Sequence, residues 1–270
     1  MGKVTLCSSE AAWNSGRVEE GGNLANKTPY KGGYFPVSPV DQHADLRDDI
    51  CLKLMDAGLE VERSHHEVGT AGQGEINYKF DTLVRSADDI LTFKYIVKNT
   101  ALEWGKTATF MPKPLMGDNG SGMHTHQSLW NDGKPLFYDE QGYGGLSDIA
   151  RWYIGGILKH APGMMLVMAS TVNSYKRFWD PGQFAPARAN WGLDDRGSLV
   201  RISANGRAEV RVPDSAVNPY LSHALLIAAI ADGIGNQIEP PKAGEAGEAL
   251  PLSLGEAIDA FRADDYIQRA

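Results

Sequence analysis

Short segments in which apolar and polar side chains alternate with a period of two are scattered irregularly among helical segments along this chain. Such strand-like segments are expected at 59–67, 75–80, 107–111, 123–130, 198–203 and 207–212. Helices are expected at 46–57, 86–104, 148–159, 219–233 and after Ser253. The sequence contains neither a Walker phosphate loop nor G-x-G-x-x-G, and strands and helices do not alternate regularly. This pattern predicts an α+β fold with an antiparallel-rich sheet and flanking helices, not a doubly wound parallel sheet.

Helix boundaries are marked by capping residues. Ser86 and Ser147 precede helical segments, and Asn218-Pro219 pairs a good cap with a residue suited to the first turn. Ser253 and Glu256 form a capping-box pattern before a short terminal helix. Residues 239–252 are rich in Pro and Gly and are expected to be a surface loop or linker.

Composition excludes several classes of protein. The chain has 270 residues and a formal net charge of -8, which argues against a nucleic-acid partner because phosphate binding needs clustered Lys and Arg. The two cysteines, Cys7 and Cys51, form neither a metal-type pair nor a disulfide framework. The most apolar run, 224–230, is far too short to span a membrane, and residues 1–13 lack the pattern of a signal peptide. A cytoplasmic protein without a membrane partner is therefore expected.

Carboxylates and an imidazole lie on the polar faces of the expected strands. Glu67 and Glu75 stand on either side of a glycine turn, which would let two adjacent strands present both carboxylates to one ion. With Glu209 and His124 they make a set that suits Mg²⁺ or Mn²⁺ rather than zinc. The alternative for the row that contains Glu209 is a surface ladder of salt bridges.

Five arginines fall within 35 residues. Guanidinium groups bind carboxylate and phosphate oxygens bidentately, so arginines beside divalent ions indicate phosphoryl transfer. The arginines are Arg177, Arg196, Arg201, Arg207 and Arg211.

Several long motifs, in order, resemble the bacterial type of glutamine synthetase. They are Lys31-Gly-Gly-Tyr-Phe-Pro36, His65-His-Glu-Val-Gly69 with Gly74-Glu-Ile-Asn77, Lys113-Pro114, Asn119-Gly-Ser-Gly-Met-His-Thr-His-Gln-Ser128, Asn173-Ser-Tyr-Lys-Arg177, Glu209-Val-Arg-Val-Pro-Asp214 and Asn218-Pro-Tyr220. The likeness extends from about residue 12 to 238. It implies one catalytic domain over 1–270 with a guanido kinase-like fold, without the N-terminal β-grasp domain of the family.

The resemblance also implies roles for matching residues. Metal ligands would be Glu67, Glu75, His124 and Glu209. Substrate-binding residues would be Asn119, Gly120, Arg177, Arg196 and Arg211, the three arginines being catalytic as well. The nucleotide would contact Phe80, His126, Ser128, Trp130 and Arg201. The implied co-substrate is ATP, the implied cofactors are two or more Mg²⁺ or Mn²⁺ ions, and the implied assembly of a full-length chain is a homo-oligomer.

The implied reaction is the ligation of ammonia to the γ-carboxylate of L-glutamate through γ-glutamyl phosphate, a step of glutamine biosynthesis and nitrogen metabolism. Two departures from the family keep alternatives open. The segment from Thr5 to Ala12 lacks the Glu-x-Glu pair of the family. The first alternative is therefore a truncated, catalytically silent chain that binds nucleotide or joins an oligomer. Phe184 stands where the flap of the family carries a Glu, and residues 178–238 resemble ligases that join glutamate to methylamine or polyamines.

Overall fold

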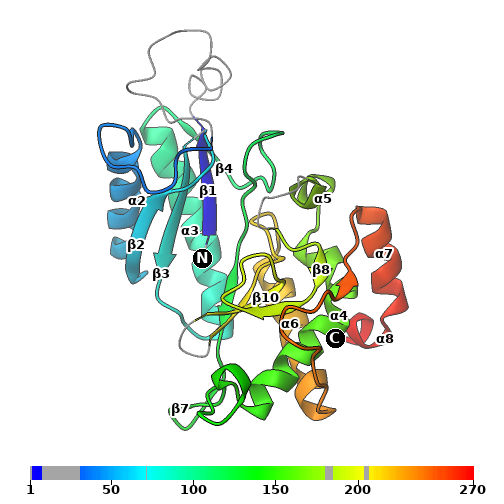
Figure 1. Ribbon diagram of the computed structural model, residues 1–270. Coiled ribbons are helices and arrows are strands. Elements are labelled where there is room, and N and C mark those ends of the chain that lie inside the picture. Colours follow the sequence, from blue (N-terminus) through cyan, green and yellow to red (C-terminus); the bar gives the residue numbers. More distant parts are fainter. Residues whose placement is uncertain (1, 8–30, 71, 180–184, 204–206) are drawn as a thin grey trace. The chain divides into compact units, whose positions relative to one another are not determined.

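The computed structural model describes residues 2–7, 31–70, 72–179, 185–203 and 207–270 (Figure 1). The chain divides into two compact units, Met1–Ser121 and Gly122–Ala270, and each is described by itself. Among the described residues, no helix combines the length and the apolar character that crossing a membrane requires.

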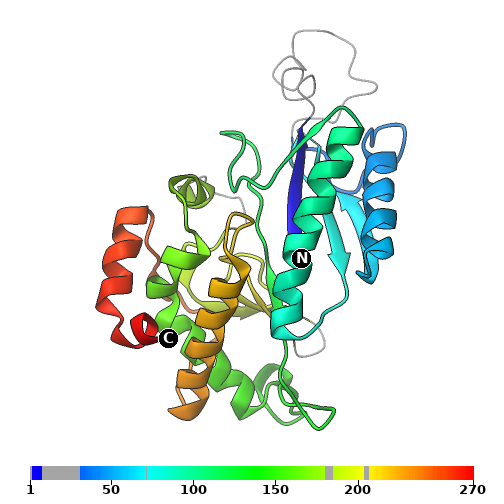
Figure 2. The ribbon, with the colours of Figure 1, turned by 180° about the vertical axis from the view of Figure 1, so that it is seen from behind.

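The first unit is a four-stranded antiparallel sheet with two helices on one face. The strand order is β2-β3-β1-β4. The strands are β1 (Gly2–Cys7), β2 (Val61–His66), β3 (Gln73–Tyr78) and β4 (Thr107–Thr109). Helices α2 (Ala44–Asp56) and α3 (Leu83–Glu103) cover the same face, which Figure 2 shows from the helix side.

A small apolar core lies between the helices and this sheet. Ile76 of β3 packs with Leu54 of α2 and Phe93 of α3, among other buried residues. Because neighbouring residues of a strand point to opposite faces, Glu75 and Asn77 project from the face that the helices do not cover. The hydrophobic periodicity of α2 and α3 therefore determines which face of the sheet is left for polar side chains.

The second unit contains a sheet in the order β5-β11-β10-β9 and a group of helices. All pairs in this sheet are antiparallel except β10 with β9, which is parallel. The strands are β5 (Thr125–Gln127), β9 (Trp191–Leu193), β10 (Val200–Ser203) and β11 (Arg207–Val210). Two further two-stranded pairs are β6 (Trp130–Asn131) with β7 (Lys134–Pro135) and β8 (Arg188–Ala189) with β12 (Glu248–Ala249).

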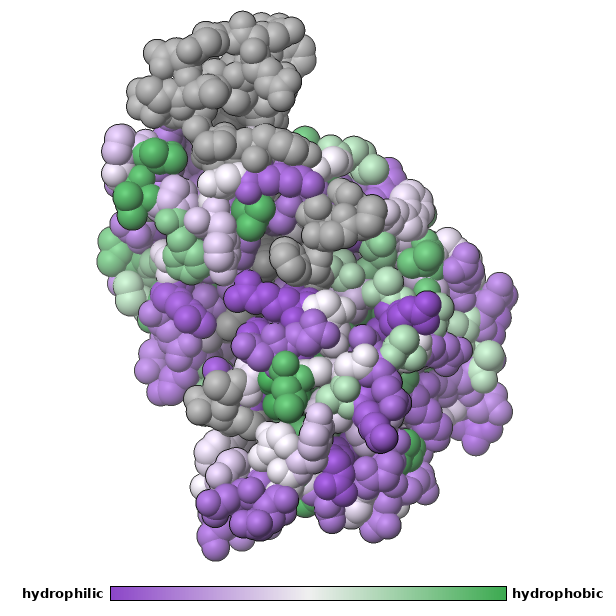
Figure 3. Space-filling model, in the orientation of Figure 1, coloured by the Kyte–Doolittle hydropathy of each residue, from purple (hydrophilic) through white to green (hydrophobic). Residues whose placement is uncertain are grey.

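The long helices of the second unit pack closely against one another. They are α4 (Asp148–Met168) and α6 (Pro219–Gly235). Helix α4 also contacts α7 (Leu254–Ala263), and both long helices contact α8 (Asp265–Arg269). The short helix α5 (Val172–Trp179) follows α4 in the chain. A 3₁₀ turn, η1, spans Tyr143–Gly145. A Cβ at Gly156 would lie 2.1 Å from the carbonyl oxygen of Ala229, so only glycine allows α4 and α6 to approach this closely. The outer surface over α7 and α8 carries mainly hydrophilic side chains (Figure 3).

The antiparallel-rich α+β class is confirmed, and most of the expected elements are present. Three elements have a boundary that differs from the expected one by more than two residues. The strand expected at 123–130 is divided, because β5 pairs with β11 over three residues and Leu136 N–H then donates to the Leu129 carbonyl in the turn toward β6 and β7. Helix α3 begins before Ser86, whose N–H donates to the Thr82 carbonyl. Helix α4 continues to Met168, because Met164, Met165 and Met168 are buried in the core.

Candidate active site

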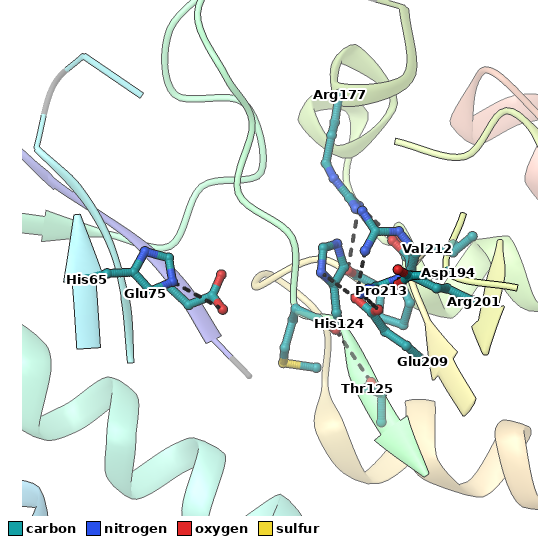
Figure 4. Close-up of polar contacts among 12 residues, drawn as sticks. His65, Glu75, His124, Thr125, Arg177, Asp194, Arg201, Glu209, Val212 and Pro213 are labelled. Atoms are coloured by element: carbon teal, nitrogen blue, oxygen red, sulfur yellow. Dashed lines mark hydrogen bonds and ion pairs between the residues drawn. The ribbon is translucent and has the colours of Figure 1, made fainter. Parts of the chain in front are cut away.

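Three side chains of types that can bind a metal ion meet on the uncovered face of the first unit. His65 of β2 lies directly opposite Glu75 of β3 in the antiparallel register, and Glu67 follows two residues after His65. One donor atom from each of the three residues lies within 4.8 Å of the others, and all three residues are buried. Figure 4 shows the His65 ring directed at the Glu75 carboxylate. The predicted pair Glu67 and Glu75 is thus brought together, with a histidine added to it.

The local fold explains this cluster. The Glu67 N–H donates to the Gln73 carbonyl at 2.6 Å and closes the turn between β2 and β3. Residues i and i+2 of a strand share a face, so His65 and Glu67 project together, and antiparallel pairing adds Glu75. Burial lowers the pKa of His65, but the carboxylates of Glu75 and Glu67 raise it more, and the net shift is upward.

The donor set fits a divalent cation. Two carboxylates and one imidazole offer oxygen and nitrogen ligands, which Mn²⁺ and other first-row ions accept. A bound cation would also offset the charge of these two buried carboxylates, which lie close together. The chemistry of these side chains therefore agrees with the metal site that the sequence predicted at Glu67 and Glu75.

The glycine loop with the predicted substrate residues lies beside this cluster. The Gln73 Nε2 group donates to the Gly120 carbonyl at 2.9 Å and to Ser121 Oγ at 3.0 Å. The Thr70 N–H donates to Asp118 Oδ2 at 2.9 Å. These bonds fasten the loop that carries Asn119 and Gly120 to the turn between Glu67 and Glu75, so both sets lie at one edge of the first unit.

A second cluster is centred on Glu209 of β11, in the second unit. Glu209 Oε1 accepts from Arg211 Nη1 at 2.6 Å and lies 3.1 Å from His124 Nδ1. Glu209 Oε2 accepts from Arg201 Nη1 at 2.8 Å (Figure 4). Glu209 and Arg211 are 2% and 4% exposed, so the surface salt-bridge ladder is the wrong interpretation for these two residues; Arg207 alone is exposed.

The environment of Glu209 favours its charged form. Burial raises the pKa of this carboxyl, but the contact with His124 and the charge of Arg211 lower it more, so that the pKa lies well below its ordinary value. Burial also lowers the pKa of the Arg211 guanidinium, against the opposing effect of Glu209. Glu209 is therefore an anion enclosed by cationic side chains.

Arg177 of α5 belongs to the same cluster. Its Nη2 donates to the Arg211 carbonyl and its Nη1 to the Val212 carbonyl, each at 2.7 Å. Burial lowers the pKa of Arg177 to about 10, against the raising effect of Asp214 and with a further lowering by Arg211. A Cβ at Gly122 would lie 2.9 Å from both Arg177 Nη2 and His124 Nε2, so a side chain at position 122 would displace the ends of these two side chains.

The other predicted residues are less closely associated. Arg196 is exposed, in the turn between β9 and β10, near enough to Arg211 for their charges to interact. His126 pairs in register with Glu209, and burial lowers the pKa of His126 to about 4. Trp130 lies in the β6–β7 hairpin, where its Nε1 donates to Ser128 Oγ at 2.9 Å. Phe80 is exposed beyond the end of β3 in the other unit. Phe184 and the Thr5–Ala12 segment beyond Cys7 lie outside the described residues.

His65 was not predicted from the sequence to lie in this cluster. The alternation of side chains along β2 could have indicated this. The strand ends at His66, and if Glu67 continues its extended backbone, residues 65 and 67 lie on one face. What was missing was the register, since only the pairing of His65 with Glu75 brings the imidazole to both carboxylates.

Comparison with known proteins agrees with these features. Residues 8–270 match the family model described as glutamine synthetase, catalytic domain. The chain is 54% identical to the glutamine synthetase of Streptomyces coelicolor over 95% of this chain and 58% of the relative. It is 53% identical to that of Mycolicibacterium smegmatis over 93% of this chain and 57% of the relative. The chain thus spans somewhat more than half the length of these relatives.

Solved structures give the same result. A structure titled GmaS/ADP complex superposes with a TM-score of 0.86 at 34% identity, over 98% of this chain and 64% of that chain. The glutamine synthetase of Plasmodium falciparum gives a TM-score of 0.84 at 28% identity, over 93% of this chain and 60% of that one. The chain therefore belongs to the glutamine synthetase catalytic-domain family.

Proposed function

We propose that this chain is the catalytic part of a glutamate–ammonia ligase, which joins ammonia to the γ-carboxylate of L-glutamate through γ-glutamyl phosphate at the expense of ATP. One observation carries the proposal: a chain 54% identical to a glutamine synthetase holds both a buried carboxylate–imidazole cluster and a buried arginine cluster. Phosphoryl transfer needs both kinds of group, because charge on the moving phosphate must be neutralised.

Divalent ions, Mg²⁺ or Mn²⁺, are held in this proposal at two places. Glu67 and Glu75 hold one ion, and His124 and Glu209 hold another. Bound ions supply positive charge that offsets the charge of the phosphates. His124 Nδ1 and Glu209 Oε1 lie 3.1 Å apart, a separation suited to two ligands of one ion. Both Glu209 oxygens also contact arginines, so Arg201 and Arg211 are positioned to turn toward an incoming phosphate.

The remaining roles follow from position and charge. Asn119 and Gly120 bind the glutamate substrate from the loop beside Glu67 and Glu75. Arg177, Arg196 and Arg211 bind its carboxylate or the acyl phosphate and offset charge in the transition state. The nucleotide is bound by Phe80, His126, Ser128, Trp130 and Arg201. An arginine held by backbone carbonyls, as Arg177 is, has a fixed orientation that suits this task.

We further propose that both units form one catalytic domain over 1–270, of guanido kinase-like architecture, in which residues 239–252 act as a surface loop. This loop forms the short strand β12 that pairs with β8. The kinship with glutamine synthetases supports a cytoplasmic homo-oligomer, with glutamate, ATP and ammonia as its small-molecule partners.

A second candidate acceptor is an alkylamine. It is supported by Phe184, an aromatic residue at a position where the family's flap has a carboxylate, and by the resemblance of residues 178–238 to ligases that join glutamate to methylamine or polyamines. An apolar ring favours an alkyl group over a small cation.

The test is phosphate release from ATP by the purified chain with glutamate, Mn²⁺ or Mg²⁺, and a panel of ammonium, methylamine and a polyamine. We expect release that depends on both glutamate and ammonium, with ammonium the best acceptor. A preference for methylamine would replace the first proposal by the second. Binding of an ATP analogue without turnover under any of these conditions would support a catalytically silent chain.

A further inference from the structure

We propose that His65 is a direct metal ligand, so that the site in the first unit is a nitrogen-containing site that prefers Mn²⁺ to Mg²⁺. This inference rests on the proposed function, in which Glu67 and Glu75 hold a divalent ion. It adds a residue of a different donor type, and with it a metal selectivity.

The hydrogen bond at Nδ1 determines which nitrogen can bind a metal. His65 Nδ1 lies 3.2 Å from the carbonyl oxygen of His66. A carbonyl oxygen only accepts, so Nδ1 carries the proton, and the lone pair of the neutral ring is at Nε2. Metal-bound histidines commonly donate their second nitrogen to a backbone carbonyl in this way, which fixes the tautomer and the orientation of the ring.

The Nε2 atom is directed at a carboxylate. Its distance to Glu75 Oε1 is 3.7 Å, longer than the roughly 2.7–3.2 Å of a nitrogen–oxygen hydrogen bond. Two ligand atoms that each lie about 2.1 Å from one ion can be separated by up to about 4.2 Å. The separation of 3.7 Å falls within this range, so one ion between Nε2 and Oε1 can be bound by both atoms, and the third donor atom, from Glu67, lies within 4.8 Å of the other two.

Aromatic packing holds the ring in place. Phe35 stacks on His65 with the ring centroids 4.2 Å apart and an angle of 21° between the planes. The Phe35 N–H donates to the same His66 carbonyl at 3.2 Å. Phe35 has a φ of 55°, a left-handed conformation that is uncommon for a residue other than glycine. The ring of His65 is thus oriented before any ion binds, with only its Nε2 edge directed toward the carboxylates.

Donor type then predicts selectivity. Mg²⁺ takes oxygen ligands almost exclusively, whereas the first-row series that begins with Mn²⁺ binds mixed nitrogen and oxygen sites with an affinity that rises toward Cu²⁺. A site of one imidazole and two carboxylates should bind Mn²⁺ more tightly than Mg²⁺. A site in which His65 serves only as an ion-pair partner of Glu75 would have oxygen ligands alone and a weaker preference.

The experiment is electron spin-echo spectroscopy of Mn²⁺ bound to the full chain, which detects nitrogen nuclei on the metal. His124 lies in the other proposed site and would contribute its own signal, so the measurement uses the His124→Gln background. We expect nitrogen coupling in this background and its loss when His65→Gln is added, together with an affinity for Mn²⁺ at least tenfold weaker. The affinity for Mg²⁺ should change less.

Two further experiments test the same inference without relying on His65→Gln alone. Labelling the His124→Gln protein with [¹⁵N]histidine should convert the coupling from ¹⁴N to ¹⁵N without any change at residue 65. His65→Glu should restore a metal site that has lost its preference for Mn²⁺. Coupling that persists in the double variant, or its absence before His65 is changed, overturns the inference.

These results are independent of the test of function. Nitrogen coupling without glutamate-dependent phosphate release would leave the His65 ligand established and remove the proposed ligase activity. Phosphate release without nitrogen coupling would support the ligase activity and remove His65 as a metal ligand.

Discussion

The two clusters of charged residues differ in the sign of the charge that they concentrate. In the first unit Glu67 and Glu75 place two carboxylates beside one imidazole. In the second unit Arg211 and Arg201 contact the single carboxylate of Glu209, and Arg177 is bound to the backbone next to it. The first arrangement is suited to a cation, whereas the second combines the proposed metal ligands His124 and Glu209 with arginines suited to an anion such as phosphate.

In the proposed ligase reaction, this difference would divide the work of phosphoryl transfer between the two clusters. A carboxylate cluster is stabilised when a metal ion binds, so its stability is linked to metal concentration. An arginine cluster organised around an internal carboxylate is stable as it is, because the charges are already paired. The comparison predicts that equivalent substitutions in the two units will have opposite consequences for folding.

The largest effect is expected at Glu67. Glu67→Gln removes one charged ligand and should lower metal-dependent phosphate release at least about 10³-fold, equivalent to about 4 kcal/mol of transition-state stabilisation. The melting temperature in EDTA should not fall, since a buried like charge is removed. Glu60→Gln, at an exposed ion pair with Lys79 in the same unit, is the control and should leave both quantities unchanged. A fall in stability without loss of activity would contradict the metal role.

Glu209→Gln, unlike Glu67→Gln, should lower the stability of the fold in the absence of metal. Breaking a buried ion pair leaves uncompensated charge and costs about 3 kcal/mol, measured by urea unfolding in EDTA. The matched control is Glu239→Gln, which removes an exposed partner of Arg151 and should cost less than about 1 kcal/mol. Equal costs for the two variants would show that the Glu209 cluster is not a stabilising feature of the second unit.

The two clusters should also respond to pH in opposite directions. The pKa of His65 is raised, so its contribution to stability is present below its unfolded pKa of 6.5 and is lost as pH rises through the folded pKa. Melting in EDTA at pH 5.5 and 8.5 should therefore show wild type more stable than His65→Gln only at the lower pH. The pKa of Glu209 is lowered, so its contribution is present above its unfolded pKa of 4.5 and declines in strong acid. A stability difference between wild type and His65→Gln that grows with pH would contradict the raised pKa of His65.

The smallest effect concerns helix capping. In the second unit Ser147 Oγ accepts from the Ala150 N–H at 3.1 Å, whereas Thr82 at the start of α3 makes no side-chain capping bond. Ser147→Ala should lower the free energy of unfolding by about 1 kcal/mol, and Thr82→Ala by no more than a few tenths. Urea unfolding measures both, and a larger cost at Thr82 would contradict the described cap geometry.

Much of the fold followed from local rules. The helix caps at Ser147, Asn218 and Ser253 were predicted and each accepts a backbone hydrogen bond. The two strands expected at 198–203 and 207–212 are also present, as β10 and β11. The boundary of α4 was not, because it depends on the burial of methionines against other elements rather than on a local stop signal.

The candidate site was predictable in composition but not in arrangement. Motifs identified Glu67, Glu75, His124 and Glu209, and the structure brings them together in two pairs, one in each unit. His65 was missed because its role depends on strand register, a tertiary property. The burial of Arg211 was missed because an alternating charged row has the same pattern on a surface and in a buried site.

The metal site of the first unit is tested most directly by a crystal of the full chain grown with Mn²⁺ and measured for anomalous scattering at the manganese edge. We expect a peak within bonding distance of His65 Nε2 and of carboxylate oxygens from Glu67 and Glu75. Ordered side chains at these three positions with no anomalous peak between them, at a Mn²⁺ concentration that supports phosphate release, would contradict it.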